Sequence, residues 1–144
     1  MIDHIGINVP DVAEAIGFFH DLLGTRVISD IRPGEIPAAW KTSFNWHHSS
    51  ELSRFVMLEL PGGSKIELFQ YEGAEVNRSQ PYQDDAGSTH IALRTPDIAK
   101  SIGIIRARGL QVLNEPITNA DGVKWFYFRT PWGSQMELVS LPHA

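Results

Sequence analysis

The chain contains one short sequence pattern twice, and this duplication constrains its fold more than any other feature. Residues 4–13 read HIGINVPDVA and residues 90–99 read HIALRTPDIA, at an offset of 90 − 4 = 86. Later in each copy, residues 63–68 read GSKIEL and residues 133–138 read GSQMEL, at an offset of 137 − 67 = 70. Matched segments in the same order indicate two modules that fold in the same way.

Each copy places one histidine and one glutamate at matching positions. These are His4 and Glu67 in the first copy and His90 and Glu137 in the second. Each glutamate lies between apolar residues in an expected strand, where a buried carboxylate is costly unless it is paired or binds a metal. One such residue alone could equally lie on an exposed strand face. All four at repeat-equivalent positions favour a single divalent metal site built by both modules.

The composition narrows the chemistry further. The 144 residues include no Cys, so a metal site must use histidine and carboxylate ligands, which suit Zn, Ni, Co, Mn or Fe. The net charge is −5 and no basic run occurs, which argues against a nucleic-acid partner. No apolar run is long enough for a membrane span and no signal-like segment opens the chain, so we expect a cytoplasmic protein.

Each copy is expected to fold as β-α-β-β-β. Apolar and polar residues alternate in 3–9 and in 88–95, as they do in half-buried strands. A Pro-Asp pair follows each segment, and Asp11 and Asp97 are good N-caps for the helices that come next. Helices are expected over 12–23 and 98–108, with further strands over 25–31, 53–60 and 64–71 in the first copy and over 111–115, 122–129 and 134–141 in the second.

The two copies differ mainly in residues 32–52. The first copy is 86 − 70 = 16 residues longer between its helix and its last strand, and this insert contains Trp40, Phe44 and Trp46. We expect these rings to form one wall of a substrate pocket, with Tyr71 of the last strand beside them. A satellite cluster packed away from the site is the alternative.

These motifs resemble the vicinal oxygen chelate superfamily. It includes glyoxalase I, methylmalonyl-CoA epimerase, extradiol dioxygenases, and the bleomycin-binding and fosfomycin-modifying resistance proteins. The segments that carry the resemblance are 4–11, 65–68, 89–93 and 135–139. The resemblance covers nearly the whole chain and implies an α+β fold, in which two βαβββ modules form a curled mixed sheet around a metal cup, often in a homodimer. It implies a single domain over 1–144, with module one at 1–72, a linker at 73–87 and module two at 88–144.

The ligand pattern is most similar to that of bacterial glyoxalase I, which uses His, Glu, His and Glu. Methylmalonyl-CoA epimerase typically has Gln at the position of Glu67. The iron dioxygenases use only three protein ligands, at the positions of His4, His90 and Glu137, and the binding-only members usually lack the set. The resemblance therefore implies that all four residues bind one divalent metal.

The same resemblance implies an enzyme. We expect a metal-dependent isomerase, epimerase or lyase of glyoxalase type, which acts on a small oxygenated metabolite through a metal-stabilised enolate. Glu137 is the first choice for the catalytic base and Glu67 is the second. An Fe(II)-dependent ring-cleaving dioxygenase and a non-catalytic antibiotic-binding resistance protein are the alternatives.

Arg94 is expected to bind an anionic group of the substrate. Glyoxalase I has an arginine for the carboxylate of glutathione where this chain has Asn8, which we expect to face the substrate. The repeat-equivalent position is 8 + 86 = 94, and it is an arginine. Arg94 shares a strand face with His90, so its guanidinium is expected to act as a bidentate clamp inside the cup. An exposed ion pair at the rim is the alternative.

Overall fold

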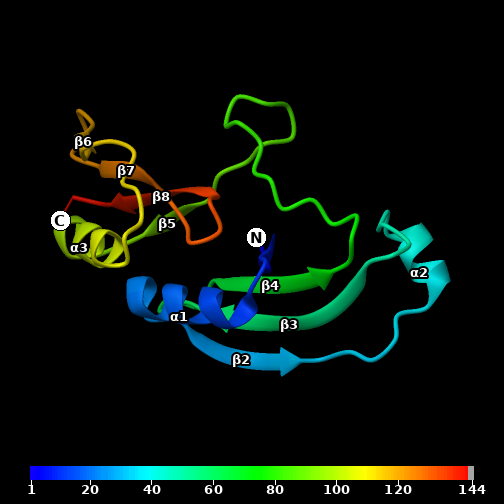
Figure 1. Cartoon of the computed structure of the whole chain (residues 1–144). Helices are drawn as coiled ribbons and strands as arrows, with labels where there is room; N and C mark the ends of the chain where they lie inside the picture. Colours follow the sequence, from blue (N-terminus) through cyan, green and yellow to red (C-terminus); the bar gives the residue numbers. More distant parts are fainter. Residues whose placement is uncertain (143–144) are drawn as a thin grey trace. The chain divides into compact units, whose positions relative to one another are not determined.

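The computed structural model describes residues 1–142 and divides into two compact units, Met1–Arg78 and a second that begins at Ser79. The first unit contains β1 (Ile5–Asn8), α1 (Val12–Leu23), β2 (Arg26–Ile31), α2 (Ala38–Ser43), β3 (Glu51–Glu59) and β4 (Lys65–Glu72), as Figure 1 shows. The second contains β5 (Ala92–Arg94), α3 (Ile98–Ala107), β6 (Ile117–Thr118), β7 (Lys124–Arg129) and β8 (Gln135–Ser140). No helix among the described residues is both long and apolar enough to cross a membrane.

Each unit contains one four-stranded mixed sheet. The strand order is β1-β4-β3-β2 in the first sheet and β5-β8-β7-β6 in the second. In both, the first strand of the unit runs parallel to the last, and the remaining neighbours are antiparallel. The two orders correspond strand for strand, as two copies of one module require. The expected α+β fold of two βαβββ modules is confirmed.

One helix packs against one face of each sheet, α1 in the first unit and α3 in the second. Alternate residues of the last strand in each unit, such as Leu68 and Leu138, are fully buried in the core. The residues between them, including Glu67 and Glu137, point to the opposite side. We call this second side, which carries Glu67 in one sheet and Glu137 in the other, the glutamate face.

The two long helices begin where the sequence predicts and end within one residue of the expected position. The carboxylates of Asp11 and Asp97 accept hydrogen bonds from the N–H groups of Glu14 at 3.1 Å and Lys100 at 2.9 Å. These caps satisfy backbone donors that the first helical turn leaves without partners. Helix α1 ends at Gly24, whose φ of 69° is a left-handed conformation that glycine adopts without strain.

The prediction of a strand over 111–115 is wrong. In this segment only Val112 forms an isolated bridge, and the named strand β6 lies further along the chain. The side chain of Asn114 explains the difference, since its Oδ1 accepts a hydrogen bond of 2.8 Å from the N–H of Tyr127. A side-chain oxygen thus replaces a backbone carbonyl at this point, and the ladder between the two segments is interrupted.

The insert at residues 32–52 contains a short helix, α2, that the sequence analysis did not predict. Lys41 lies in its last turn, and its side chain is only 8% exposed. The Nζ of Lys41 donates hydrogen bonds to Oε1 of Glu51 at 2.6 Å and to the carbonyl of His48 at 3.3 Å. These bonds tie α2 to the beginning of β3, so the insert is anchored to the first sheet.

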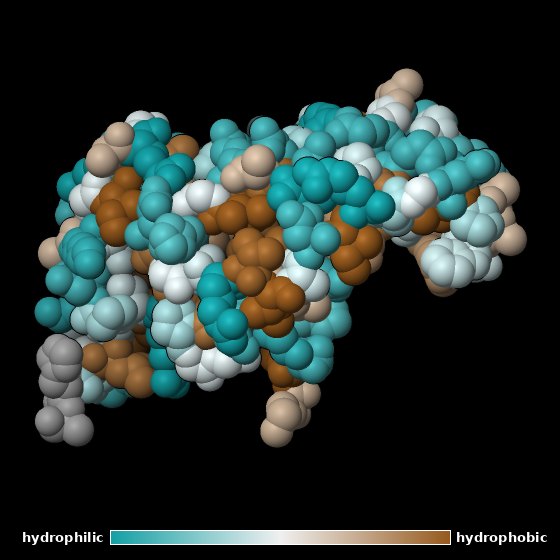
Figure 2. Space-filling model, turned by 90° about the horizontal axis from the view of Figure 1, so that it is seen from below, coloured by the Kyte–Doolittle hydropathy of each residue, from teal (hydrophilic) through white to brown (hydrophobic). Residues whose placement is uncertain are grey.

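On the face drawn in Figure 2, apolar residues appear in patches among hydrophilic ones. The edge strand β2 contributes three exposed aliphatic side chains, which are Val27, Ile28 and Ile31. Exposed edges with apolar side chains are sites at which a second chain can pair unless charge or a covering segment prevents it.

Candidate metal and substrate site

Glu67 lies in the middle of β4 on the glutamate face of the first sheet. Its Cα partners are Gly6 of β1 and Met57 of β3, and its side chain is 17% exposed. His4 directly precedes β1 and places its Nε2 3.1 Å from Oε2 of Glu67. An imidazole nitrogen and a carboxylate oxygen this close to each other can bind the same cation.

The other ring nitrogen of His4 is held by Asp3. Nδ1–H donates to Oδ2 of Asp3 at 2.8 Å, and Nζ of Lys65 donates to the second carboxylate oxygen at 3.1 Å. The hydrogen bond from His4, followed by that from Lys65, lowers the pKa of Asp3 below its usual value. When Nδ1 carries the proton, Nε2 keeps the lone pair that a metal needs. Asp3 was not among the predicted site residues, although its position next to His4 was a usable signal.

The second unit contains the corresponding pair. Glu137 lies in the middle of β8, with Ala92 of β5 and Tyr127 of β7 as Cα partners, and its side chain is 15% exposed. His90 precedes β5 and places its Nε2 3.3 Å from Oε2 of Glu137. The ring of Tyr127 packs edge-on against the imidazole at a centroid distance of 5.2 Å. Tyr127 therefore supports the second pair from the neighbouring strand.

The four predicted ligands thus form two His–Glu pairs, one in each unit. Within the described part of either unit, no group of three or more metal-ligating side chains forms. Sites for divalent metals commonly use three or four protein ligands. The nitrogen and oxygen donors fit a divalent metal of the first transition series.

A continuous row of aromatic rings joins the insert to the glutamate face of the first sheet. In order, and with centroid distances between 5.0 and 6.1 Å, the rings are Trp40, Phe44, Trp46, Tyr71, Phe69 and Phe55. Trp46 meets Tyr71 edge-on at the shortest of these distances, and Tyr71 shares its strand face with Glu67. Burial, together with the negative charge of Glu67, raises the pKa of Tyr71, so its hydroxyl remains a hydrogen-bond donor.

Arg94 lies on the glutamate face of the second sheet. Leu93 before it is buried, whereas Arg94 is exposed, and its Cα partner is Val139, two residues beyond Glu137. Among residues 1–142, no hydrogen bond or ion pair involves the Arg94 side chain. Among the described residues, the donors of the Arg94 guanidinium are therefore available to a ligand. Asn8 lies on the corresponding face of β1.

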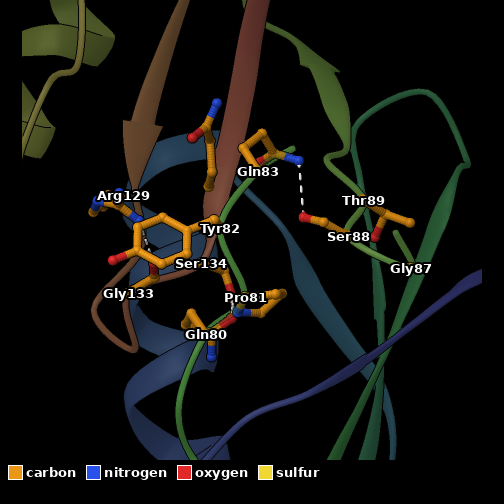
Figure 3. Close-up of a pocket in the computed structure, with 11 residues that line it drawn as sticks. Gln80, Pro81, Tyr82, Gln83, Gly87, Ser88, Thr89, Arg129, Gly133 and Ser134 are labelled. Atoms are coloured by element: carbon orange, nitrogen blue, oxygen red, sulfur yellow. Dashed lines mark hydrogen bonds between the residues drawn. The ribbon is translucent and has the colours of Figure 1, made fainter. Parts of the chain in front are cut away.

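A pocket of about 610 Å³ lies in the second unit, at the beginning of β8 (Figure 3). It is lined by Gln80, Pro81, Tyr82, Gln83, Gly87, Ser88, Thr89, Arg129, Gly133, Ser134 and Gln135. Gln135 lies two residues before Glu137, and Thr89 directly precedes His90, so the pocket adjoins the second His–Glu pair. The pocket was not predicted from the sequence because a loop forms much of its wall. A usable signal was the difference between the copies at Arg129, where the first copy has Glu59.

The sequence profile of the Glyoxalase/Bleomycin resistance protein/Dioxygenase superfamily matches residues 1–138. The chain therefore belongs to this superfamily, as the resemblance to vicinal oxygen chelate proteins predicted. A glyoxalase family protein from Bacillus cereus has a TM-score of 0.79 at 16% identity, over 98% of this chain and 94% of that one. The fosfomycin resistance protein FosX from Listeria monocytogenes, complexed with Mn(II) and sulfate, has a TM-score of 0.63 at 16% identity, over 99% and 93%. At these identities, the likeness shows a shared fold.

One relative is informative about the reaction. The 2-epi-5-epi-valiolone epimerase of Actinomyces sp is 32% identical over 146 residues, which cover 98% of this chain and 79% of the relative. Together with superfamily membership, this likeness supports chemistry of the isomerase or epimerase type.

Proposed function

We propose that this protein is a metal-dependent epimerase that acts on a small hydroxylated ketone. The observation that carries the proposal is the repetition of one His–Glu pair at equivalent positions of two sheets. Inversion at carbon by proton transfer needs a group that removes a proton and a group that returns one to the other side. The similarity to an epimerase supports inversion as the reaction.

His4, Glu67, His90 and Glu137 would hold the metal. When bound there, a divalent metal supplies Lewis acidity to neighbouring substrate oxygens, so that the C–H group next to the carbonyl becomes more acidic. Three features fit these roles. They are the short His–Glu distances, the limited exposure of both glutamates and the hydrogen bond from His4 to Asp3.

We assign the first proton transfer to Glu137. Its carboxylate takes the proton from the carbon next to the carbonyl, while His90 and Tyr127 restrict the carboxylate to one region of the face. Glu67 enters this step as the carboxylic acid, delivers its proton to the opposite side of the same carbon and ends as the carboxylate. In the reverse direction the two glutamates exchange roles. The neutral hydroxyl of Tyr71 donates a hydrogen bond to a substrate oxygen on the Glu67 side.

Incubation with 2-epi-5-epi-valiolone in D₂O tests the proposal. We expect NMR to show deuterium at the carbon next to the carbonyl and accumulation of a second epimer, with both signals lost on chelation and restored by added metal. Absence of exchange with this ketone and with simpler hydroxy ketones would contradict an epimerase. Consumption of oxygen with ring cleavage would instead identify a dioxygenase, and binding without turnover a binding protein.

Replacement of Arg94 tests how the substrate is held. We propose that Arg94 binds an oxygen-rich, anionic end of the substrate, because its guanidinium is exposed on the glutamate face and has no partner among residues 1–142. Arg94→Lys is expected to raise KM roughly tenfold with unchanged metal content, since lysine keeps the charge but loses the planar fork. Arg106→Lys, which alters an exposed pair with Glu115, serves as the control. An unchanged KM in Arg94→Ala would contradict this role.

Replacement of Trp46 tests whether the insert forms a pocket wall. Trp46→Ala is expected to raise KM about three- to tenfold, because the ring supports Tyr71 and such aromatic contacts contribute about 0.5–1.5 kcal/mol. Trp40→Ala, two rings further along the row, is expected to have a smaller effect. A lower melting temperature with unchanged KM in Trp46→Ala would place the cluster outside the pocket.

We also propose that the protein is a homodimer. The exposed aliphatic side chains of β2 support this proposal, because a second copy that covered this edge would remove them from water. Sedimentation equilibrium at micromolar concentration is expected to give a mass of 2 × 16.1 = 32.2 kDa. A mass of one chain under these conditions would contradict the proposal.

A further inference from the structure

Arg129 is the one cationic side chain in the lining of the pocket of the second unit, and that lining contains no acidic side chain. The NH1 of Arg129 donates a hydrogen bond of 3.0 Å to the carbonyl of Gly133 (Figure 3). Within the described part of the chain, no carboxylate pairs with this guanidinium. The Gly133 bond fixes one edge of the group and leaves its remaining donors for another acceptor.

Two neutral side chains of the pocket also have hydrogen-bond donors available for a ligand. Oε1 of Gln80 accepts a hydrogen bond from the hydroxyl of Ser134 at 2.9 Å, so the NH₂ group of Gln80 remains available. Oγ of Ser88 accepts from Nε2 of Gln83 at 3.1 Å, which leaves the Ser88 O–H to donate. Donors around one cation form an environment that suits a group with several negatively charged oxygens.

The positive charge of Arg129 is a difference between the two copies of the repeat. Position 129 corresponds to 129 − 70 = 59, which is Glu59, and position 89 corresponds to 89 − 86 = 3, which is Asp3. In the first unit these two acids are neutralised, because Glu59 pairs with Arg26 and Asp3 pairs with Lys65. The second unit has Arg129 and Thr89 at these positions and Gln135 at the position of Lys65, so the two ion pairs of the first unit are replaced by a single charged side chain in the pocket lining.

We propose that this pocket binds a phosphate group carried by the substrate, with Arg129 as its principal contact. This inference rests on the proposed function, from which it takes the class of ligand, a hydroxylated ketone. Arg129 and Gln135 are Cα partners, and Gln135 lies two residues from Glu137, which corresponds to about 6.6 Å along the strand at about 3.3 Å per residue. A phosphate in the pocket therefore places the carbon skeleton of its ester beside Glu137.

The position of Arg94 is consistent with a ligand that extends along the glutamate face. Its Cα partner Val139 lies four residues from Gln135 on β8, or about 13 Å along the strand. The two arginines thus lie on opposite sides of Glu137. In this arrangement the phosphate binds at Arg129, and Arg94 binds oxygens at the other end of the substrate. The volume of about 610 Å³ is within the usual range for small-molecule sites.

Calorimetric titration with dihydroxyacetone phosphate, dihydroxyacetone and inorganic phosphate tests the proposal without requiring turnover. The wild-type protein is expected to bind the phosphate ester at least about tenfold more tightly than dihydroxyacetone and more tightly than inorganic phosphate. Arg129→Gln is expected to remove the preference for the ester, and Arg129→Lys to retain part of it. The surface variant Arg106→Gln, which alters an exposed ion pair with Glu115, is expected to keep it.

Three results would overturn the proposal. They are a wild-type protein with no preference for the ester, a preference that survives Arg129→Gln, and inorganic phosphate that binds as tightly as the ester. Titration after chelation separates this pocket from a metal, since a phosphate held by the metal would be lost on chelation and kept in Arg129→Gln. A protein that fails the exchange assay but shows the Arg129-dependent preference would disprove the epimerase and leave the phosphate pocket intact.

Discussion

Alanine in place of His90 or Glu137 is expected to reduce the affinity for divalent metal at least about 100-fold and to abolish proton exchange. Each substitution removes one of four proposed ligands, and loss of an outer-shell partner alone typically costs about 10–100-fold in metal affinity or activity. Elemental analysis of the purified variants and metal titration after chelation measure the loss. His4→Ala and Glu67→Ala are expected to have effects of the same size, because each of them also removes one of the four proposed ligands.

The matched control for the histidine variants is His47→Ala. His47 is exposed in the insert and belongs to neither His–Glu pair. This variant is expected to keep the metal content and melting temperature of the wild type. Full metal content in both His90→Ala and Glu137→Ala would exclude the proposed site, whatever the activity of these variants.

The parts of the fold that were predictable from the sequence are those that local pattern determines. Strand alternation placed Glu67 and Glu137 on the side of each sheet away from the helix, and the structure shows this arrangement. The caps at Asp11 and Asp97 were predictable because a cap depends on residues within one helical turn. The repeat offset gave each module one histidine and one glutamate at equivalent positions, and in the structure these two side chains lie close together in each unit.

The parts that were not predictable depend on contacts between distant segments. No named strand forms at 111–115, because the side chain of Asn114 accepts a hydrogen bond from the backbone of Tyr127, thirteen positions away. Helix α2 is anchored by Lys41 through partners seven and ten positions later. Such contacts override local preference, and no periodic pattern indicates them.

The pocket beside Glu137 was missed for a related reason. Its walls combine the loop at 80–89 with the ends of β7 and β8, and the polarity of that loop indicated only that it lies outside the core. The informative signal was a difference between the repeats, an arginine where the first copy has Glu59. The residues shared by the two copies indicated the proposed metal ligands, whereas the pocket was indicated by a position at which the two copies differ in charge.

Glu137→Gln is expected to lower the rate of epimerisation about 10²–10⁴-fold, the usual contribution of a positioned general base. Glutamine keeps the shape of the side chain and an oxygen that can remain a metal ligand, so more metal should be retained than in Glu137→Ala. The amide cannot accept the proton. Glu67→Gln is expected to lower epimerisation to a similar extent, but the two variants should differ in proton exchange.

That difference separates the two-base mechanism from a mechanism with one base. If Glu137 deprotonates one epimer and Glu67 the other, Glu137→Gln stops deuterium exchange in the first epimer. Glu67→Gln still permits exchange in that epimer but forms no inverted product. The control Glu115→Gln alters an exposed carboxylate in an ion pair with Arg106 and should leave both rates unchanged. Undiminished exchange of both epimers in Glu137→Gln would remove Glu137 from the role of base. Undiminished epimerisation in Glu67→Gln would show instead that a single base serves both sides of the carbon.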